Sequence, residues 1–298
     1  MKPVPFRYVA ASSAEEAVAR LAEHGDDAMI LAGGQSLLPL LNLRLARPSV
    51  LIDVSRIAEL DYVVESDGAL EIGAVTRKRT VEHSPLVRER HPLLHTATCL
   101  IGHAPIRSRG TVGGSLVQAD PAAEYPALAV ALGATLRVRG AGTTRTIAAD
   151  DFFQGFLATA LAPGEILAAV RWPLLPSRSG WSCLEFARRP GDFALAGVVA
   201  TVSLDDAGRY SEARLVPFGV GPRPVRARAA EAALAGERPG DSLHLRAAER
   251  AVAELEPPQS DAHASSEYRA HLTRVLVQRA LAEATARATS SRGGARGV

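Results

Sequence analysis

The spacing of apolar residues predicts alternating helices and strands in the first part of the chain. Residues 12–24 carry small and branched apolar side chains at helical spacing, with serines before them and Gly25 after them, which predicts a capped helix. The short apolar runs at 28–31 and 50–54 predict buried strands. These segments together predict a compact first subdomain over residues 1–57.

A second subdomain is predicted over residues 58–176. Turn residues separate its apolar runs, and a linker rich in proline, serine and glycine follows it. Thr76 is expected to cap a short basic helix, and residues 150–155 are expected to form a surface turn. The main predicted elements are strands at 62–65, 70–73, 135–139, 143–147 and 165–172 and helices at 92–101 and 122–132.

The last third of the chain separates its strands from its helices. Three predicted strands, at about 182–187, 195–204 and 212–220, precede three predicted helices. Those helices cover about 226–235, 245–255 and 266–288. The order predicts an α+β domain over residues 177–288, followed by a disordered tail at 289–298.

The stretch from Ile106 to Tyr125 is a glycine-rich loop that is expected to lead into a helix. Its three glycines, Gly110, Gly113 and Gly114, can take positive φ and let backbone amides approach an anion. Asp120 is the expected N-cap of the helix, with Pro121 in its first position and Gly133 as its C-terminal stop. A second Gly-Gly pair, Gly33-Gly34, follows the strand at 28–31. We interpret the two loops as gripping one extended, doubly charged ligand.

A pyrophosphate needs several donors aimed inward, and both loops offer them. The amides of residues 33–36 and 111–115 and the hydroxyls of Ser36, Thr111 and Ser115 are the candidates. Glu124 either accepts a hydrogen bond from a sugar hydroxyl or only favours the helix dipole. Neither loop matches G-x-G-x-x-G, and no G-x-x-x-x-G-K-[ST] is present, so the sequence does not predict a Rossmann or P-loop site.

Composition narrows the class of protein. The chain has 298 residues, 47% of them hydrophobic, which is enough for two or three subdomains with cores of their own. A net charge of +2, from 34 basic and 32 acidic residues, lacks the strongly basic balance typical of nucleic-acid binding. The N-terminal residues lack the apolar core of a signal peptide and no run reaches membrane-span length, so we expect a cytoplasmic protein without a membrane span.

No metal site is predicted from the cysteines and histidines. Cys99 and Cys183 are too few for an iron–sulfur site, which takes four cysteine ligands, and Cys99 is expected in the core. His91 and His95 share a helix but lack a third ligand. His103, Arg107 and Arg109 flank the loop and face either phosphate or solvent. No catalytic residue is predicted from spacing.

Five stretches together resemble the FAD-binding medium subunit of the molybdenum hydroxylases, most closely the carbon monoxide dehydrogenase medium chain, within the wider xanthine dehydrogenase family. They are residues 32–39, 101–115, 120–126, 164–167 and 188–197. The resemblance implies an FAD-binding domain of the vanillyl-alcohol-oxidase (PCMH) type in two α+β subdomains, followed by a small α+β C-terminal domain. It also implies an oxidoreductase in which this chain binds FAD noncovalently. Molybdopterin and [2Fe-2S] clusters would be carried by a large and a small partner subunit, commonly in a dimer of heterotrimers.

The resemblance also implies which residues bind the cofactor. Residues 32–36 and 111–115 would hold the diphosphate, and Leu37, Ile101 and Leu167 would line the flavin. Phe193 stands where relatives often have tyrosine, and Gln35 stands where many have histidine. The full implied set is Ile30, Leu31, Ala32, Gly33, Gly34, Gln35, Ser36, Leu37, Ile101, Gly102, His103, Gly110, Thr111, Gly113, Gly114, Ser115, Glu124, Ile166, Leu167 and Phe193.

Two other functions stay open at the level of sequence. One is a stand-alone flavin reductase or oxidase of the same fold, and the other is an assembly subunit that has lost FAD. The resemblance of the last third to the medium-subunit domain argues against the first, and the intact glycines at 33, 34, 113 and 114 argue against the second. In the favoured reading, electrons reach this subunit from [2Fe-2S] clusters and leave for an external acceptor.

Overall fold

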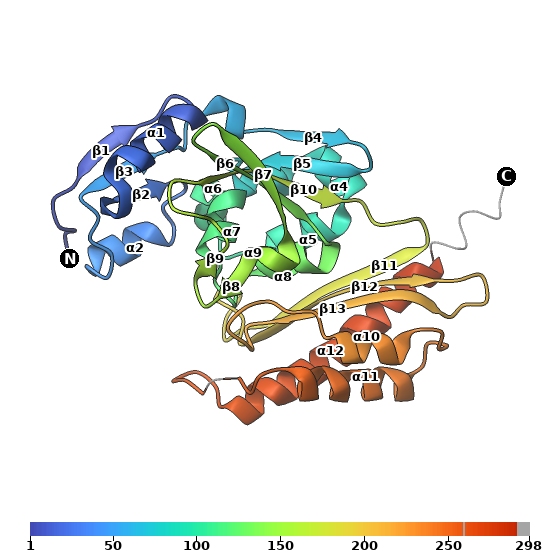
Figure 1. The fold of residues 1–298 in the computed structure, drawn as a ribbon. Helices are drawn as coiled ribbons and strands as arrows, with labels where there is room; N and C mark the ends of the chain where they lie inside the picture. The colour runs from blue at the N-terminus through green and yellow to red at the C-terminus, as the bar shows by residue number, and fades with distance from the viewer. Residues whose placement is uncertain (259, 291–298) are drawn as a thin grey trace. The chain divides into compact units, whose positions relative to one another are not determined.

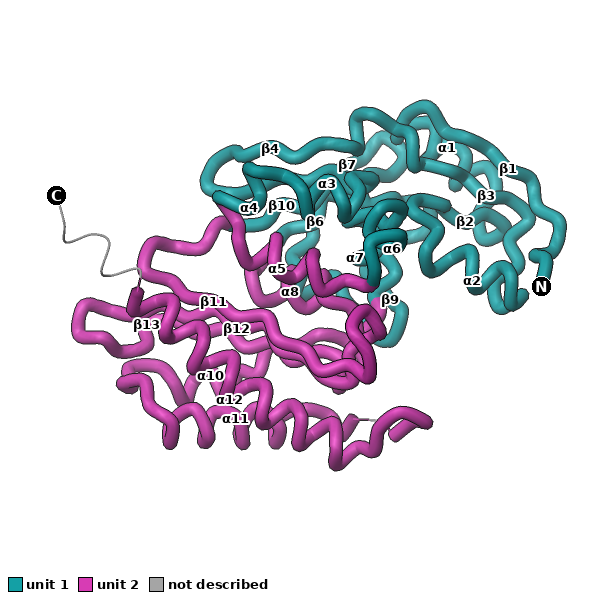
Figure 2. The backbone as a smooth tube through the Cα atoms, turned by 180° about the vertical axis from the view of Figure 1, so that it is seen from behind, with its two compact units in different colours: residues 1–89, 103–119, 134–173 teal, residues 90–102, 120–133, 174–298 magenta. Residues whose placement is uncertain are grey.

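The computed structural model describes residues 1–258 and 260–290 (Figure 1). The chain forms two compact units, coloured separately in Figure 2. Unit 1 contains residues 1–89, 103–119 and 134–173, and unit 2 contains residues 90–102, 120–133 and 174–298, of which 259 and 291–298 lie outside the described part. Because each unit is assembled from distant segments, the continuous domain bounds predicted above stay a prediction.

The N-terminal part of unit 1 is a parallel sheet of three strands in the order β1-β3-β2, covered by helix α1 (Figure 1). Its elements are β1 (Arg7–Ala10), α1 (Ala14–His24), β2 (Ala28–Leu31) and β3 (Val50–Asp53). Ser13 caps α1 by accepting a hydrogen bond from the Glu16 amide at 3.1 Å, while the Glu16 carboxylate accepts one from the Ser12 amide at 2.9 Å. The predicted helix and both strands are confirmed. The prediction that residues 28–31 are buried is wrong, because Met29 is exposed and the other three residues are only half-buried.

A five-stranded antiparallel sheet forms the rest of unit 1, in the order β4-β5-β10-β6-β7. Residues of α1, β3 and β10 share one apolar core, so the small sheet and the large sheet are joined through α1. The predicted strands of this sheet are confirmed. The strands are β4 (Val63–Ser66), β5 (Ala69–Gly73), β6 (Thr135–Gly140), β7 (Thr143–Ala148) and β10 (Ile166–Pro173).

Short helices and a small hairpin complete unit 1. The Thr76 hydroxyl accepts from the Tyr62 amide and donates to the Tyr62 carbonyl, so it does not cap α3 as predicted, and Arg77 holds the cap position. The predicted surface turn at 150–155 is also wrong, because Phe152 and Phe153 are buried in a helix and a strand. The elements are α2 (Leu37–Asn42), α3 (Lys78–His83), α4 (Pro85–Arg90, whose last residue belongs to unit 2), α6 (Ala104–Arg109), α7 (Val112–Gln118), α9 (Ala149–Phe152), β8 (Phe153–Gly155), β9 (Ala158–Thr159) and the 3₁₀ turns η1 (Gly25–Asp27) and η2 (Ala58–Leu60).

Unit 2 is built on an antiparallel sheet of strands β11, β12 and β13, with helices on both faces (Figure 1). Val198, Ala200 and Val202 of β12 point into the core under α10–α12, while α8 packs on β12 and β13. β12 is therefore almost continuously apolar. The predicted order of strands and then helices is confirmed. The elements are α5 (Pro92–Leu100), α8 (Glu124–Leu132), β11 (Ser179–Phe186), β12 (Ala196–Leu204), β13 (Tyr210–Phe218), α10 (Arg228–Leu234), α11 (Asp241–Glu254) and α12 (Ser266–Ser290).

Two predictions about helix ends in unit 2 need correction. Asp120 does not cap α8, because its carboxylate accepts from the Ala122 amide in a turn and Ala123 holds the cap position. Gly133 does end α8, in the left-handed conformation, as predicted. Of the predicted tail, the first two residues end α12, and 291–298 lie outside the described residues.

Candidate nucleotide-binding site

The two glycine-containing segments meet within unit 1. A Cβ atom on Gly33 would lie 2.8 Å from the Cα atom of Gly110 and closer still to the carbonyl oxygen of Arg109. A Cβ atom on Gly114 would lie 3.9 Å from that of Ala32. The structure therefore brings residues 32–34 beside residues 109–114, although 80 positions separate Gly33 from Gly113 (113 − 33 = 80).

The first segment presents a row of unbonded backbone donors. Gly34 has φ +74°, and this left-handed residue turns the chain between β2 and α2. In the part of the chain that the structure describes, the amides of residues 33–36 donate to no protein acceptor. Consecutive free amides in such a turn form a concavity that binds anions. The Gln35 side chain folds back and donates to the Gly33 carbonyl at 3.1 Å, which stiffens the turn.

The second segment differs from the predicted loop, because it contains helices α6 and α7. The Thr111 hydroxyl caps α7 by accepting from the Gly114 amide at 3.0 Å. Gly110, Gly113 and Gly114 do not adopt positive φ, which corrects the predicted reason for these glycines. Close packing explains Gly113, since a Cβ atom there would lie 2.6 Å from that of Ala74.

Most amides of the second segment are already bonded within the protein. The Val112 amide donates to the Thr76 carbonyl at 3.0 Å and the Gly113 amide to the Ala74 carbonyl at 2.8 Å. The Ser115 amide donates to the Thr111 carbonyl at 3.3 Å. The expectation that the amides of 111–115 serve an anion is therefore wrong for residues 112–115. The Thr111 amide and the hydroxyls of Thr111 and Ser115 are what this segment can still donate.

Two basic residues that were not predicted as site residues, Arg77 and Lys78, lie beside the second segment. Lys78 is 8% exposed, and its Nζ donates to the Ser115 Oγ at 3.3 Å. Arg77 donates from its guanidinium to the carbonyl of Arg109, and burial, followed by the charge of Arg109, lowers the pKa of Arg77. One signal was available in the sequence, because Lys78 is one of only two lysines beside 32 arginines.

Arg107, one of the residues that flank the second segment, forms an ion pair with Glu82 at 2.8 Å. A phosphate group would therefore have to compete with Glu82 for the Arg107 guanidinium. His103 is exposed at the start of α6, and the Arg109 side chain is exposed too. Ser36 is exposed beside its free amide.

The predicted apolar residues of unit 1 lie around the same segments. Ile30 and Leu31 belong to β2, and Leu37 begins α2 directly after the free amides. Ile166 and Leu167 are buried in β10, against which α7 packs.

Unit 2 contains four of the predicted residues. Ile101 is buried after α5, and Gly102 follows it with φ +51°. Glu124 is buried at the start of α8. Phe193 lies in the connection between β11 and β12 with 65% of its surface exposed.

Glu124 lies close to a second carboxyl group, that of Glu185 in β11. Burial, followed by the charge of Glu124, raises the pKa of Glu185 to about 8. Burial also raises the pKa of the Cys183 thiol, with the charges of Glu185 and Glu124 adding to the effect. Glu185 therefore carries a proton at neutral pH.

The structure contradicts the prediction for Cys99 and shows where His91 and His95 lie. Cys99 is exposed rather than in the core, with its Sγ 3.9 Å from the Nε2 of His95. His91 caps α5 by accepting from the Leu94 amide at 3.4 Å. Within residues 1–258 and 260–290, no three His, Cys, Asp or Glu side chains are grouped as metal ligands would be.

The helices of the described chain include none that is long and apolar enough to cross a membrane.

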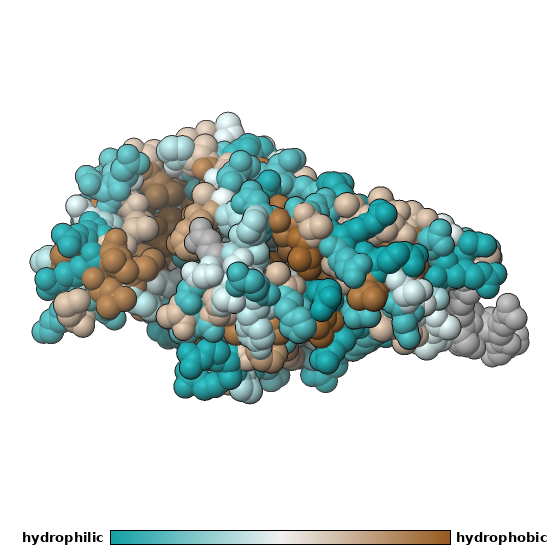
Figure 3. Space-filling view, turned by 90° about the horizontal axis from the view of Figure 1, so that it is seen from below, coloured by the Kyte–Doolittle hydropathy of each residue, from teal (hydrophilic) through white to brown (hydrophobic). Residues whose placement is uncertain are grey.

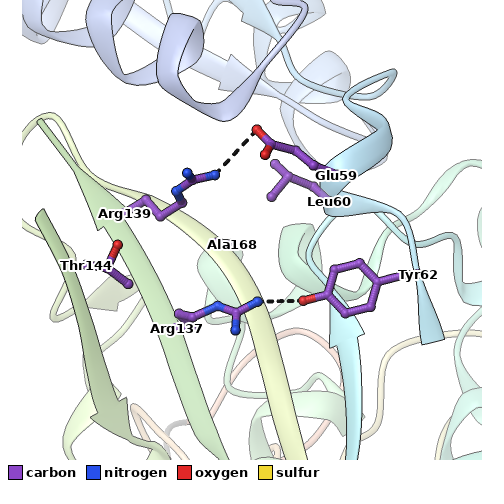
Figure 4. Close-up of a pocket in the computed structure, with 7 residues that line it drawn as sticks. All are labelled: Glu59, Leu60, Tyr62, Arg137, Arg139, Thr144 and Ala168. Carbon is purple, nitrogen blue, oxygen red and sulfur yellow. Dashed lines mark hydrogen bonds and ion pairs between the residues drawn. The ribbon is translucent and has the colours of Figure 1, made fainter. Parts of the chain in front are cut away.

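A separate pocket of about 370 Å³ lies on the large sheet of unit 1 (Figure 4). Arg139 pairs with Glu59 there at 3.4 Å, and Arg137 donates to the Tyr62 hydroxyl at 2.6 Å. Burial, followed by a hydrogen bond to Glu71, raises the pKa of Tyr62 to about 12. An anion in this pocket would compete with Glu59 for Arg139. The free amides at 33–36 face no such competition from a bonded partner, so they fit a phosphate better.

The fold is that of an α+β protein. The free amides of residues 33–36 and the hydroxyls of Ser36, Thr111 and Ser115 are together called the cradle, and donors of this kind suit a phosphate group. Residues 4–175 match the family described as FAD binding domain in molybdopterin dehydrogenase, and residues 182–284 match the CO dehydrogenase flavoprotein C-terminal domain. The chain belongs to this family of FAD-binding subunits of molybdenum-containing dehydrogenases. The predicted fold, family and FAD cofactor are thereby confirmed.

Individual relatives match over nearly their full length. The chain is 41% identical to the 6-hydroxypseudooxynicotine dehydrogenase complex subunit alpha of Paenarthrobacter nicotinovorans, covering 97% of each chain. It is 37% identical to the carbon monoxide dehydrogenase medium chain of Hydrogenophaga pseudoflava, covering 96% of this chain and 99% of the relative. A solved structure of carbon monoxide dehydrogenase from that organism superposes with a TM-score of 0.93 at 39% identity, covering 96% of this chain and 99% of the other.

Proposed function

We propose that this chain is the FAD-carrying subunit of a cytoplasmic molybdenum hydroxylase, accepting electrons from [2Fe-2S] clusters of a small partner subunit and passing them to an external acceptor. The observation that carries the proposal is the row of free amides at 33–36, held beside Gly110 by packing that leaves no room for a side chain on Gly33. When bound, FAD supplies the ability to take up and release electrons, which ordinary side chains lack.

The residues of this chain would bind and orient the cofactor. The amides of 33–36 and the hydroxyls of Ser36, Thr111 and Ser115 would hold the diphosphate, because each can donate toward phosphate oxygens. Glu124, in unit 2, would accept from a sugar hydroxyl. Leu37, Ile101, Leu167 and Phe193 would supply apolar contact to the flavin.

Partner subunits form part of the same proposal. An iron–sulfur cluster takes four cysteine ligands and this chain has two cysteines, so clusters would be carried by another subunit, with molybdopterin on a third. Leu38, Leu43 and Leu45, which lie on and after α2, are 41%, 57% and 73% exposed. An exposed apolar surface of this kind is typical of one that a partner protein covers, which supports a complex. Figure 3 shows apolar side chains gathered over this part of unit 1. We infer a dimer of heterotrimers.

The test uses the complex that co-purifies with the tagged full-length chain, in the wild type and in Gly33→Ala. We expect the wild-type complex to contain iron, molybdenum and equimolar FAD, and the variant complex to keep the metals but lack FAD. After reduction with dithionite and mixing with a quinone, the iron–sulfur absorbance should recover much more slowly in the variant. Equal recovery in both would contradict the electron route, and a purified chain without iron or molybdenum would contradict the partner assignment.

A further inference from the structure

Lys78 is a charged side chain buried beside the second segment. It begins α3, and its amide donates to the Gly110 carbonyl at 2.9 Å. Its side chain then runs past Gly110, where an added Cβ atom would lie 3.4 Å from the Lys78 Cδ, and ends at the Ser115 hydroxyl. The backbone at Gly110 therefore has Lys78 packed on it as well as Gly33.

The surroundings of Lys78 favour an anion. Arg77 precedes it in the chain and contacts the carbonyl of Arg109, so three basic residues lie around the segment 109–115. Burial, followed by the charge of Arg109, lowers the pKa of Arg77, while the charges of Asp61 and Asp53 act in the opposite direction. An anion bound at this segment would be attracted by these basic residues.

We propose that the Lys78 ammonium group binds the diphosphate of the nucleotide cofactor, acting with the Ser115 hydroxyl and the free amides of residues 33–36. The inference rests on the proposed function for the identity of the cofactor. Backbone amides are neutral donors, whereas a diphosphate is an anion, and a hydrogen bond between two charged groups is about twice as strong as one between neutral groups. Lys78 would add a positive charge to the neutral donors of the amides and hydroxyls.

The choice of lysine agrees with this role. The chain uses arginine almost everywhere else for its basic residues. Lysine presents a compact charge on a flexible stem and binds phosphate as a point charge, while arginine needs room for a planar fork. The Lys78 stem packs beside Gly110, where an added Cβ atom would lie 3.4 Å from its Cδ and 3.5 Å from its Cε.

The test measures cofactor binding rather than turnover. FAD is removed from the full-length chain and titrated back, with binding followed by the change in flavin fluorescence. The variants are Lys78→Met, which keeps the side-chain length without the charge, and Lys78→Arg, which keeps the charge. Lys2→Met is the matched control, because Lys2 is the other lysine and is exposed. Adenosine diphosphate and adenosine serve as competitors that differ only in the diphosphate.

We expect Lys78→Met to weaken FAD binding about ten- to hundredfold, the loss expected for one hydrogen bond to a charged group. Competition by adenosine diphosphate should weaken by a similar factor, while competition by adenosine should not change. Lys78→Arg keeps the charge but carries the bulkier planar fork, so it should recover only part of the affinity, and Lys2→Met should bind FAD as the wild type does. Thermal unfolding of the FAD-free variants separates lost binding from lost folding, and Lys78→Gln replaces Lys78→Met if that chain does not fold.

The outcomes distinguish this inference from the proposed function. Unchanged FAD affinity in Lys78→Met, together with loss of FAD in Gly33→Ala, would overturn the role of Lys78 and leave the cradle standing. Equal weakening of adenosine and adenosine diphosphate would also overturn it, since Lys78 would then act on the whole site. FAD retention by Gly33→Ala as well would overturn the proposed cradle itself.

Discussion

Gly33 packs against Gly110 so closely that a Cβ atom on Gly33 would lie 2.8 Å from the Gly110 Cα atom. The contact joins the turn after β2 to the end of α6 and fixes the position of the four free amides. Backbone atoms, unlike the tip of a flexible side chain, cannot move aside cheaply. The site therefore depends on the absence of a side chain at this residue.

We expect Gly33→Ala to lose FAD, because the added methyl group must push the turn away from residues 109–110. The free energy of unfolding should also fall, by about 1–3 kcal/mol, as for other overpacked sites. The flavin absorbance of the purified chain and its thermal unfolding measure the two effects. Gly155→Ala is the control, since a Cβ atom at Gly155 meets nothing within 4 Å, and it should keep FAD. A yellow Gly33→Ala chain would contradict the cradle.

The manner of attachment gives a second prediction. We expect FAD to be held noncovalently, by hydrogen bonds that are lost when the chain unfolds. Precipitation of the purified protein with acid should leave the yellow colour in the supernatant. Colour that stays in the washed pellet would contradict this prediction.

Local patterns were enough to predict much of the fold. The helix at α1 follows from Ser13, Glu16 and an apolar stripe, all within one segment. The strands of unit 2 follow from continuous apolar runs between turns. These features depend on neighbours in sequence, so the sequence contains the information directly.

Features that depend on distant contacts were not predicted. The glycines of residues 110–114 indicated an open loop, whereas contact with Ala74 and the Thr111 cap hold a short helix there. The burial of Lys78 has no local signal, because it results from packing of α3 against α6. The pairing of Glu124 with Glu185 likewise joins a helix start to a strand about sixty positions away (185 − 124 = 61).

Packing of α12 on the sheet of unit 2 gives a third prediction. A Cβ atom on Gly180 would lie 2.8 Å from the carbonyl carbon of Ala284 and closer still to its oxygen, so β11 and α12 touch backbone to backbone. We expect Gly180→Ala to reduce the free energy of unfolding by about 1–3 kcal/mol or more. Chemical denaturation measures the change. Gly221→Ala, where the nearest atom would lie at an ordinary 3.7 Å, should be close to neutral.

A buried arginine gives a fourth prediction. Arg269 donates to the Leu195 carbonyl at 2.6 Å, to the Gly219 carbonyl at 3.1 Å and to the Asp261 carboxylate at 2.7 Å. Arg269→Met leaves these acceptors without their donor, so we expect a loss of about 1–3 kcal/mol in chemical denaturation. Arg274→Met on the exposed face of the same helix is the control and should change little. Equal stability of the two variants would show that Arg269 does not anchor α12.

The protonated carboxyl group of Glu185 gives a fifth prediction, which concerns pH. Its pKa is about 8 in the folded chain against an ordinary 4.5, because of burial and then of the charge of Glu124. Over this window the folded chain keeps a proton that the unfolded chain releases, so stability falls as pH rises from about 4.5 to about 8 and then levels off.

Glu185→Gln removes this titration and keeps the shape of the side chain. We therefore expect the Tm of the variant, relative to the wild type, to rise across the same window and to stay constant above it. Thermal unfolding in a series of buffers measures the difference. Glu249→Gln, on the exposed face of α11, is the control and should give a difference without this rise. A difference for Glu185→Gln that does not change with pH would mean that the Glu185 carboxyl group is ionised in the folded chain.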